Sequence, residues 1–297
     1  MRPVLAAAVL AATGCATVRP ECGIHGGTPW LEVRSEHFVM HTNLDEPDAL
    51  RMSAELELGL AALHRAMRQG VPKTPAPVEA VVLRNVDQLQ GAIGQSNVVG
   101  YWRPDWRGPL IVMGGQSTLT ASDRDLATLK HELTHFVSAY HLGRQPRWVA
   151  EGLGRYFQTL GVDVEKRLVR SGELERDALA QVQWQGLLPL EKLWRWGPPG
   201  SLPPELESAA YASSWLWVHF LFNRHKGPLK QFFDRLRARE EPRAAFEAVF
   251  PNPKLLYEEA KRYLDLGDYR VTVAPLGEVA TGATVKPFSN SDVHGLL

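Results

Sequence analysis

The chain has 297 residues, of which 44% are hydrophobic, and its 33 Lys and Arg residues balance 33 Asp and Glu residues. This hydrophobic content excludes a disordered protein, and the length allows one large domain or two small ones with a substantial core. Because the charges balance, no global field draws the chain toward nucleic acid or an anionic membrane surface, so we expect no nucleic-acid partner.

The first fifteen residues have the features of an export signal. Arg2 precedes a short apolar stretch from Val4 to Ala12, and small residues then lead to Cys15. Such an order is typical of a signal peptide, and its last four residues, ATGC, resemble a bacterial lipobox, in which the cysteine is acylated. We expect export to the bacterial cell envelope with a lipid anchor on Cys15; the alternative is ordinary cleavage to a periplasmic or secreted protein.

The rest of the chain divides into a tether (16–29), a main domain (30–266) and a tail (267–297) that is either an edge hairpin or loose. No stretch after the signal reaches the roughly 18 apolar residues that would span a bilayer, so we expect no transmembrane helix in the mature chain. If Cys15 carries lipid, Cys22 has no partner, and we expect no disulfide framework.

The start of the main domain predicts a small sheet with a helix on it. The stretch 30–42 alternates apolar and polar residues, as one strand with Phe38 and Met40 on the same face would. A helix capped by Asn43 or Asp45 follows. Further strands are predicted at 78–83, 98–102 and 109–115.

From Ser122 onward the pattern is helical. Helices are predicted at 122–141, from 147 onward, and at 209–225, 228–240 and 253–265, and the Pro-rich segment 196–204 predicts a loop. The expected fold class is therefore α+β, with a small mixed N-terminal sheet and a mostly helical C-terminal half.

The helix over 122–141 carries the motif HELTH at residues 131–135. Because His131 and His135 are about one helical turn apart, both imidazoles project from the same face and can reach one zinc ion. Glu132 points about 100° away around the helix axis. There it can take a proton from zinc-activated water and pass it to a leaving amine. The plain alternative is two ordinary surface histidines.

A catalytic zinc needs a third protein ligand, and two residues compete for that role. His141 has the spacing of the pattern HExxHxxGxxH, but Ser138 stands where that pattern has its helix-breaking glycine. If the helix continues, His141 lies about 9 Å further along the axis. Glu151 follows a Gly- and Pro-containing turn (143–146) that brings a second helix back, and Gly residues in that helix permit a close approach. This geometry favours Glu151 over His141.

HELTH followed after a short turn by PRWVAEGLGRYF resembles the gluzincin clan of metallopeptidases, most of all the peptidase-MA-like domains of bacterial envelope proteins. The resemblance covers roughly residues 30–265 and implies a zincin-like fold. It also implies His131, His135 and Glu151 as zinc ligands and Glu132 as the general base. In aminopeptidase-N-like relatives a tyrosine about sixty residues after the third ligand stabilises the oxyanion, and Tyr211 falls there; core packing is the equal alternative.

Those relatives also carry a glycine-x-methionine-glutamate-asparagine strand whose glutamate anchors the substrate's free amine. This chain has VMGGQ at 112–116, without the acidic anchor, which favours an endopeptidase. We expect the strand at 110–114 either to be an exposed sheet edge that pairs with the substrate backbone or to be purely structural.

The sequence thus predicts a zinc endopeptidase of the cell envelope that acts on a peptide or protein substrate. The alternative is a noncatalytic lipoprotein that uses the zincin fold as a scaffold or partner-binding domain. Retention of Glu132 beside three ligands argues against that alternative, because a scaffold has no use for a base beside a metal.

Overall fold

The computed structural model describes residues 28–67, 77–96, 98–105, 108–115, 123–198 and 200–289. The expected signal peptide, the lipobox with Cys15, Cys22 and the predicted helix start at Ser122 lie outside the described residues. Within the described ranges, no helix combines the length and the apolar character needed to cross a bilayer.

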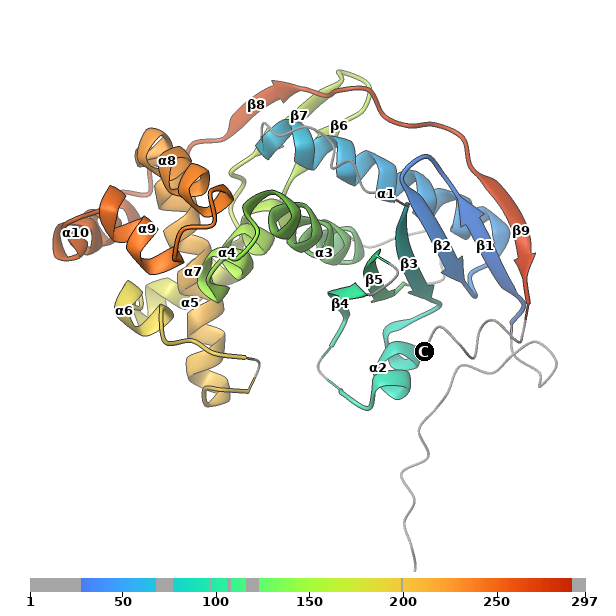
Figure 1. Cartoon of the computed structure of the whole chain (residues 1–297), viewed down its shortest axis with the longest axis horizontal. Coiled ribbons are helices and arrows are strands. Elements are labelled where there is room, and N and C mark those ends of the chain that lie inside the picture. Colours follow the sequence, from blue (N-terminus) through green and yellow to red (C-terminus); the bar gives the residue numbers. More distant parts are fainter. Residues whose placement is uncertain are drawn as a thin grey trace, which may run out of the picture.

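The fold is α+β, as predicted, with most strands in the N-terminal half and most helices in the C-terminal half (Figure 1). The strands are β1 (Trp30–Arg34), β2 (Phe38–Thr42), β3 (Val78–Leu83), β4 (Gly100–Asp105), β5 (Gly108–Gly114), β6 (Gly161–Asp163), β7 (Leu168–Ser171), β8 (Thr272–Pro275) and β9 (Thr284–Phe288). The helices are α1 (Glu46–Met67), α2 (Val86–Ile93), α3 (Asp123–Leu142), α4 (Arg147–Gln158), α5 (Arg176–Gln185), α6 (Leu190–Leu193), α7 (Pro204–Arg224), α8 (Lys226–Arg237), α9 (Pro242–Val249) and α10 (Pro253–Leu266).

The larger sheet is mixed and has the described strand order β4-β5-β3-β2-β1-β9. β3 is parallel to both β2 and β5, and the other neighbours are antiparallel. Alternate residues of β3 enter two different cores: Ala80 and Val82 join the main core with α1 and α3, whereas Val81 and Leu83 pack with Leu89 of α2. The sheet is therefore buried on both faces by helices.

The stretch 30–42 forms two antiparallel strands, β1 and β2, so the prediction of a single strand is wrong. The polar run at residues 35–37 turns the chain, and the Ser35 N–H donates to the Phe38 carbonyl at 3.0 Å. Phe38 and Met40 do lie together in the main core, as the alternation predicted. Asp45 is the residue that caps α1, through a hydrogen bond from the Asp48 N–H at 3.0 Å.

The predicted edge strand, 110–114, is not at an edge. It forms β5, which has β4 on one side and β3 on the other. Among the described strands, β4 and β9 occupy the two edges of this sheet, and β4 is the edge strand that pairs antiparallel with β5. The sequence marked both segments as strands, but the order of strands in a sheet is a tertiary property that alternation does not encode.

The turn between α3 and α4 forms where the sequence placed it. Gly143 has a left-handed backbone (φ 64°) and its N–H donates to the Ala139 carbonyl, which ends α3; α4 begins directly after Pro146. Gly152 permits a close helix approach, but to α7: a Cβ atom there would lie 2.5 Å from the Ser214 carbonyl oxygen. α4 is thus packed between α3 and α7, in the middle of the helical half.

The tail supplies one strand to each sheet, so β8 and β9 do not form a hairpin with each other. β8 pairs with β7 and β9 pairs with β1, and the segment between them runs along α1 from the helical half to the large sheet (Figure 1, red). Lys286 on β9 reaches the buried Glu32 on β1 at 3.1 Å. The short elements α2, α5, α6, α9, β6 and β7 were not predicted.

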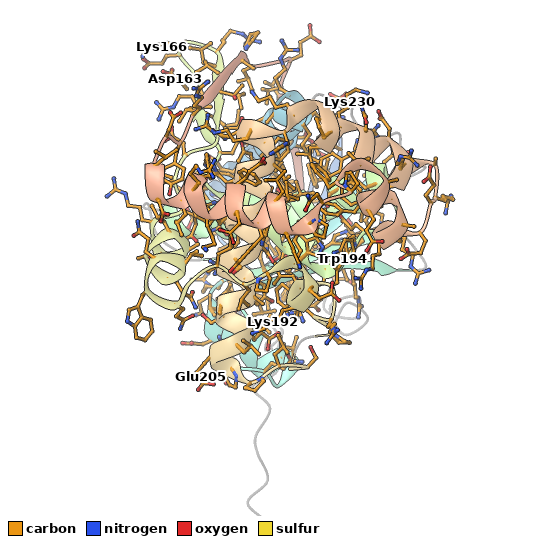
Figure 2. All side chains as sticks on the ribbon, turned by 90° about the vertical axis from the view of Figure 1, so that its left-hand side faces the viewer. Asp163, Lys166, Lys192, Trp194, Glu205 and Lys230 are labelled. Atoms are coloured by element: carbon orange, nitrogen blue, oxygen red, sulfur yellow. The ribbon has the colours of Figure 1, made fainter. Side chains whose placement is uncertain are left out.

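Exposed charges of both signs cover the outer face of the helical half. Figure 2 shows Lys192 on α6, Glu205 at the start of α7 and Lys230 on α8, all of which are exposed. Lys230 forms an ion pair with Asp234 one turn further along α8, at 2.7 Å. This mixed surface agrees with the balanced composition of the chain.

Candidate metal centre

Two imidazoles meet on one face of α3. His131 and His135 lie one turn apart, with 4.6 Å between ring centroids and 3.0 Å between the two Nε2 atoms. The opposite face of α3 is anchored in the core by Leu129, Leu133 and Val137, all of them buried. The helix therefore presents both rings from a fixed position, as the motif predicted.

A carboxylate from α4 completes this group. The Oε2 atom of Glu151 lies 3.5 Å from Nε2 of His131 and 3.5 Å from Nε2 of His135. The three ligand atoms all lie within 4.8 Å of one another. His141, the competing candidate, is elsewhere: its ring contacts His64 of α1, with 6.0 Å between centroids. The structure therefore brings together the three predicted ligands and leaves His141 apart.

The spacing of the three atoms fits a small transition-metal ion. Ligand atoms about 2.0–2.1 Å from a tetrahedral zinc ion lie about 3.3 Å from each other. The separations here are 3.0, 3.5 and 3.5 Å. Two imidazoles and one carboxylate form a donor set that catalytic zinc sites use, and non-haem iron sites use it as well. The group is thus suited to hold a metal ion with at least one position left for a reactant.

A glutamine at the end of α4 sets the orientation of His131. Nδ1 of His131 lies 3.2 Å from Oε1 of Gln158. Since a carboxamide oxygen only accepts, Nδ1 carries the hydrogen, and the lone pair of the neutral ring is on Nε2, which faces His135 and Glu151. An outer partner on the second ring nitrogen is the usual way in which proteins orient metal-binding histidines.

Gly154 makes room for the same ring. A Cβ atom at this position would lie 2.7 Å from Cε1 of His131 and 2.9 Å from its two nitrogen atoms. Real Cβ atoms do not approach this closely, so the His131 ring occupies space that any other residue at 154 would fill. The glycine thus serves the contact between α4 and α3 at the metal centre.

Glu132, next to His131 on α3, faces β4. Its side chain is buried, and burial raises its pKa to about 7, while the charge of His131 and a backbone hydrogen bond from Trp102 act in the opposite direction. Gly100 lets β4 come close, because a Cβ atom there would lie 3.3 Å from Cγ of Glu132. The carboxyl is therefore held between the metal centre and the edge strand, with a pKa suited to proton transfer near neutrality.

Glu151 has the opposite electrostatic setting. Burial alone would raise its pKa, but the hydrogen bonds and charges of His131 and His135 outweigh burial and hold the pKa well below its usual range. Its other oxygen, Oε1, faces the guanidinium of Arg147 at 3.7 Å from Nε. Glu151 is thus an ionised carboxylate, with Oε2 directed to the two histidines and Oε1 directed to Arg147.

Tyr211 on α7 reaches the site through the same arginine. Its hydroxyl oxygen accepts a hydrogen bond from Arg147 at 3.0 Å, and its ring packs edge to face on Trp196 with 4.8 Å between centroids. Burial, with the nearby charge of Glu151, raises the Tyr211 pKa, so the hydroxyl keeps its proton. Tyr211 is thus packed against Trp196 and linked through Arg147 to Glu151, and its role at the oxyanion stays a prediction.

Arg147 and Gln158 are the site residues that the sequence analysis missed. Both lie on the face of α4 that carries Glu151, one turn before it and two turns after it, and this periodicity was the available signal. Arg155, one turn after Glu151, is bound instead to Glu175 at 2.9 Å.

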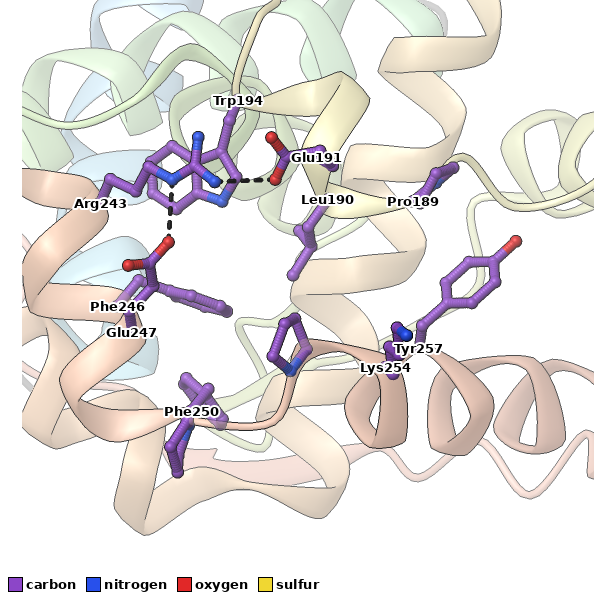
Figure 3. Close-up of a pocket in the computed structure, with 12 residues that line it drawn as sticks. Pro189, Leu190, Glu191, Trp194, Arg243, Phe246, Glu247, Phe250, Lys254 and Tyr257 are labelled. Atoms are coloured by element: carbon purple, nitrogen blue, oxygen red, sulfur yellow. Dashed lines mark hydrogen bonds and ion pairs between the residues drawn. The ribbon is translucent and has the colours of Figure 1, made fainter.

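A separate cavity of about 460 Å³ lies between α6, α9 and α10. Figure 3 shows its apolar floor and, at its rim, Arg243 held between Glu191 and Glu247 at 2.8 and 2.9 Å. None of the residues that line it belongs to the metal centre. Its charged groups neutralise one another, so we assign it no chemistry.

Comparison of the sequence with models of known protein families gives no match, and comparison with curated proteins gives none either.

Proposed function

We propose that this protein is a zinc-dependent peptidase of the gluzincin type, exported to the bacterial cell envelope as its first residues suggest. The observation that supports this most is the convergence of His131, His135 and Glu151 next to a buried glutamate, Glu132, whose pKa is raised to about 7. Three protein ligands leave a coordination position open, which is the arrangement of catalytic zinc sites. A proton-transferring carboxyl beside them is a requirement of hydrolysis.

The residues of the chain divide the work of peptide hydrolysis between them. A zinc ion, when bound, would polarise the scissile carbonyl and acidify a water molecule. Glu132 accepts the proton that the water loses and delivers it to the leaving nitrogen. Tyr211 keeps its proton, and its hydroxyl oxygen accepts from Arg147, so its own hydrogen is available to the developing oxyanion.

β4 is the strand along which we place the substrate. It is an edge strand of six residues among the described strands, and it contacts Glu132 through Gly100 and Trp102. An exposed edge pairs with an extended peptide through main-chain hydrogen bonds, independently of the peptide's ends. We therefore propose cleavage within peptides or proteins, with an edge strand different from the one that the sequence indicated.

The test is hydrolysis by the Glu132→Gln variant. Purified full-length protein is incubated with a mixture of unrelated peptides, the fragments are identified by mass spectrometry, and zinc is measured in the same samples. We expect cleavage by the wild type and by Glu258→Gln, an exposed glutamate on α10. Glu132→Gln should keep its zinc and lose cleavage, because an amide cannot accept the proton. Equal cleavage by Glu132→Gln and wild type would rule out this mechanism.

A further inference from the structure

Arg147 has an acceptor for each part of its guanidinium. The side chain is 13% exposed, and it lies one helical turn before Glu151 on α4. Nη2 donates to Oε1 of Glu207 and to the Tyr211 hydroxyl, both at 3.0 Å, and Nη1 donates to the Gly197 carbonyl. Nε faces Glu151. With all its nitrogens engaged by the protein, this cation is not left free to bind a substrate carboxylate.

The two oxygens of Glu151 face different partners. Oε2 lies 3.5 Å from both metal-facing imidazole nitrogens, whereas Oε1 lies 3.7 Å from Nε of Arg147. At 3.7 Å the contact between Oε1 and the guanidinium is an ion pair and not a hydrogen bond, and it leaves Oε2 as the oxygen that faces the two imidazoles. The position of the guanidinium therefore favours the orientation in which Oε2 points inward.

The guanidinium itself is fixed by its surroundings. Its carbon lies 4.1 Å from the ring centroid of Trp196, a residue that is buried at the start of the 196–203 loop. Stacking on Trp196 sets the plane of the group, and the Gly197 carbonyl and Glu207 set its rotation within that plane. Through its planar guanidinium, Arg147 of α4 thus contacts both Trp196 and Gly197 before α7 and Glu207 and Tyr211 on α7.

We infer that Arg147 is a positioning residue, which presents Glu151 to the metal through a single oxygen and holds Tyr211 beside it. This inference rests on the proposed function, since it requires that Glu151 bind zinc. Arg147 is not one of the three ligand residues, and its partners are protein groups. It acts through the residues that it positions, and its effect is therefore visible in metal binding without any measurement of peptide cleavage.

The chain offers a matched control on the same helix. Arg155 lies one turn after Glu151, as Arg147 lies one turn before it, and its guanidinium is also 5.6 Å from the Tyr211 ring. However, Arg155 forms its ion pair with Glu175, which precedes α5, and not with Glu151. Arg147→Met and Arg155→Met remove the same charge one turn before and one turn after Glu151, and only the first removes a partner of Glu151.

The experiment measures the zinc dissociation constant of the full-length variants by competition with a chromogenic chelator, with folding checked by circular dichroism. We expect Arg147→Met to bind zinc about 10- to 100-fold more weakly than the wild type. Arg155→Met should bind zinc as the wild type does. Unchanged affinity in Arg147→Met, or an equal loss in Arg155→Met, would overturn the inference.

A second variant, Arg147→Lys, separates geometry from charge and keeps a cation in the buried network should the Met variant fail to fold. Because an ammonium cannot form the planar fork, we expect weaker zinc binding and an altered visible spectrum of the Co²⁺-loaded protein. A wild-type affinity and spectrum in Arg147→Lys would contradict the positioning role. If the wild type itself binds no zinc, the proposed function fails; if the wild type binds zinc and these variants bind it equally well, only the role of Arg147 fails.

Discussion

The backbone of Gly154 on α4 lies directly against the imidazole ring of His131 on α3. The nearest ring atom, Cε1, would be 2.7 Å from a Cβ atom at position 154. The two residues are held in contact because α4 is wedged between α3 and α7, so neither helix can withdraw without disturbing the core.

This contact makes the metal centre sensitive to one methyl group. In Gly154→Ala the new Cβ must push His131 out of line with His135 and Glu151, and the overlap costs about 1–3 kcal/mol. We expect weaker zinc binding, measured by chelator competition. Gly227→Ala on α8 is the control, since nothing lies within 4 Å of a Cβ atom there. Wild-type zinc affinity in Gly154→Ala would show that the ring is not confined as the structure indicates.

Tyr211→Phe tests the hydroxyl without disturbing the packing of the ring. If the hydroxyl donates to the oxyanion, its loss should lower kcat about 10²- to 10³-fold with little change in KM. Zinc content should not change, because Tyr211 is not a ligand. Tyr257→Phe, which removes a hydroxyl that donates to the Leu187 carbonyl away from the site, serves as the control. An unchanged kcat in Tyr211→Phe would reduce Tyr211 to a packing residue.

A buried histidine outside the site makes stability depend on pH. His219 is fully buried between the Gly172 carbonyl, to which its Nε2 donates, and the Tyr263 hydroxyl, from which its Nδ1 accepts. Burial lowers its pKa to about 4 from its usual 6.5, so the unfolded chain takes up the proton first. Its contribution is complete above about pH 6.5 and is lost as the pH falls toward 4.

Between these values the contribution of His219 alone to the free energy of unfolding should fall by up to about 1.4 kcal/mol per pH unit. Urea unfolding followed from pH 7 to pH 5 measures this slope. His219→Gln should make the slope shallower, although not flat, because burial also lowers the pKa of His64 to about 4. An identical slope in wild type and His219→Gln would mean that His219 does not stay neutral in the folded protein.

The ligand group could be predicted from the sequence because helical periodicity and one turn signal determine it. A spacing of four residues places His131 and His135 on one face, and the break at Gly143 returns the chain so that Glu151 faces them. The face of α4 that carries Glu151 also carries Arg147 and Gln158, whose importance depends on what that face meets. Gln158 meets His131 of α3, and Arg147 meets Glu207 and Tyr211 of α7. These contacts depend on how the helices pack, which the local sequence pattern does not predict.

The order of the strands could not be predicted for a similar reason. The sequence indicated strands at both β4 and β5, yet which of them is at the edge depends on pairings across the whole sheet. β9 pairs with β1 from more than 240 residues away in sequence, and its alternation is too short to indicate a partner. The polar turn at residues 35–37 was visible in the sequence and should have divided the first strand in two.

The metal content of purified variants tests the central claim most directly. Wild-type protein is loaded with zinc, dialysed and analysed by mass spectrometry for zinc and iron, beside Glu151→Ala and His141→Ala. We predict one zinc ion per chain in the wild type and in His141→Ala, and loss of zinc in Glu151→Ala, because Oε2 of Glu151 faces both imidazoles while His141 lies against His64. Loss of zinc in His141→Ala with retention in Glu151→Ala, or a wild-type protein that holds no zinc, would contradict the account.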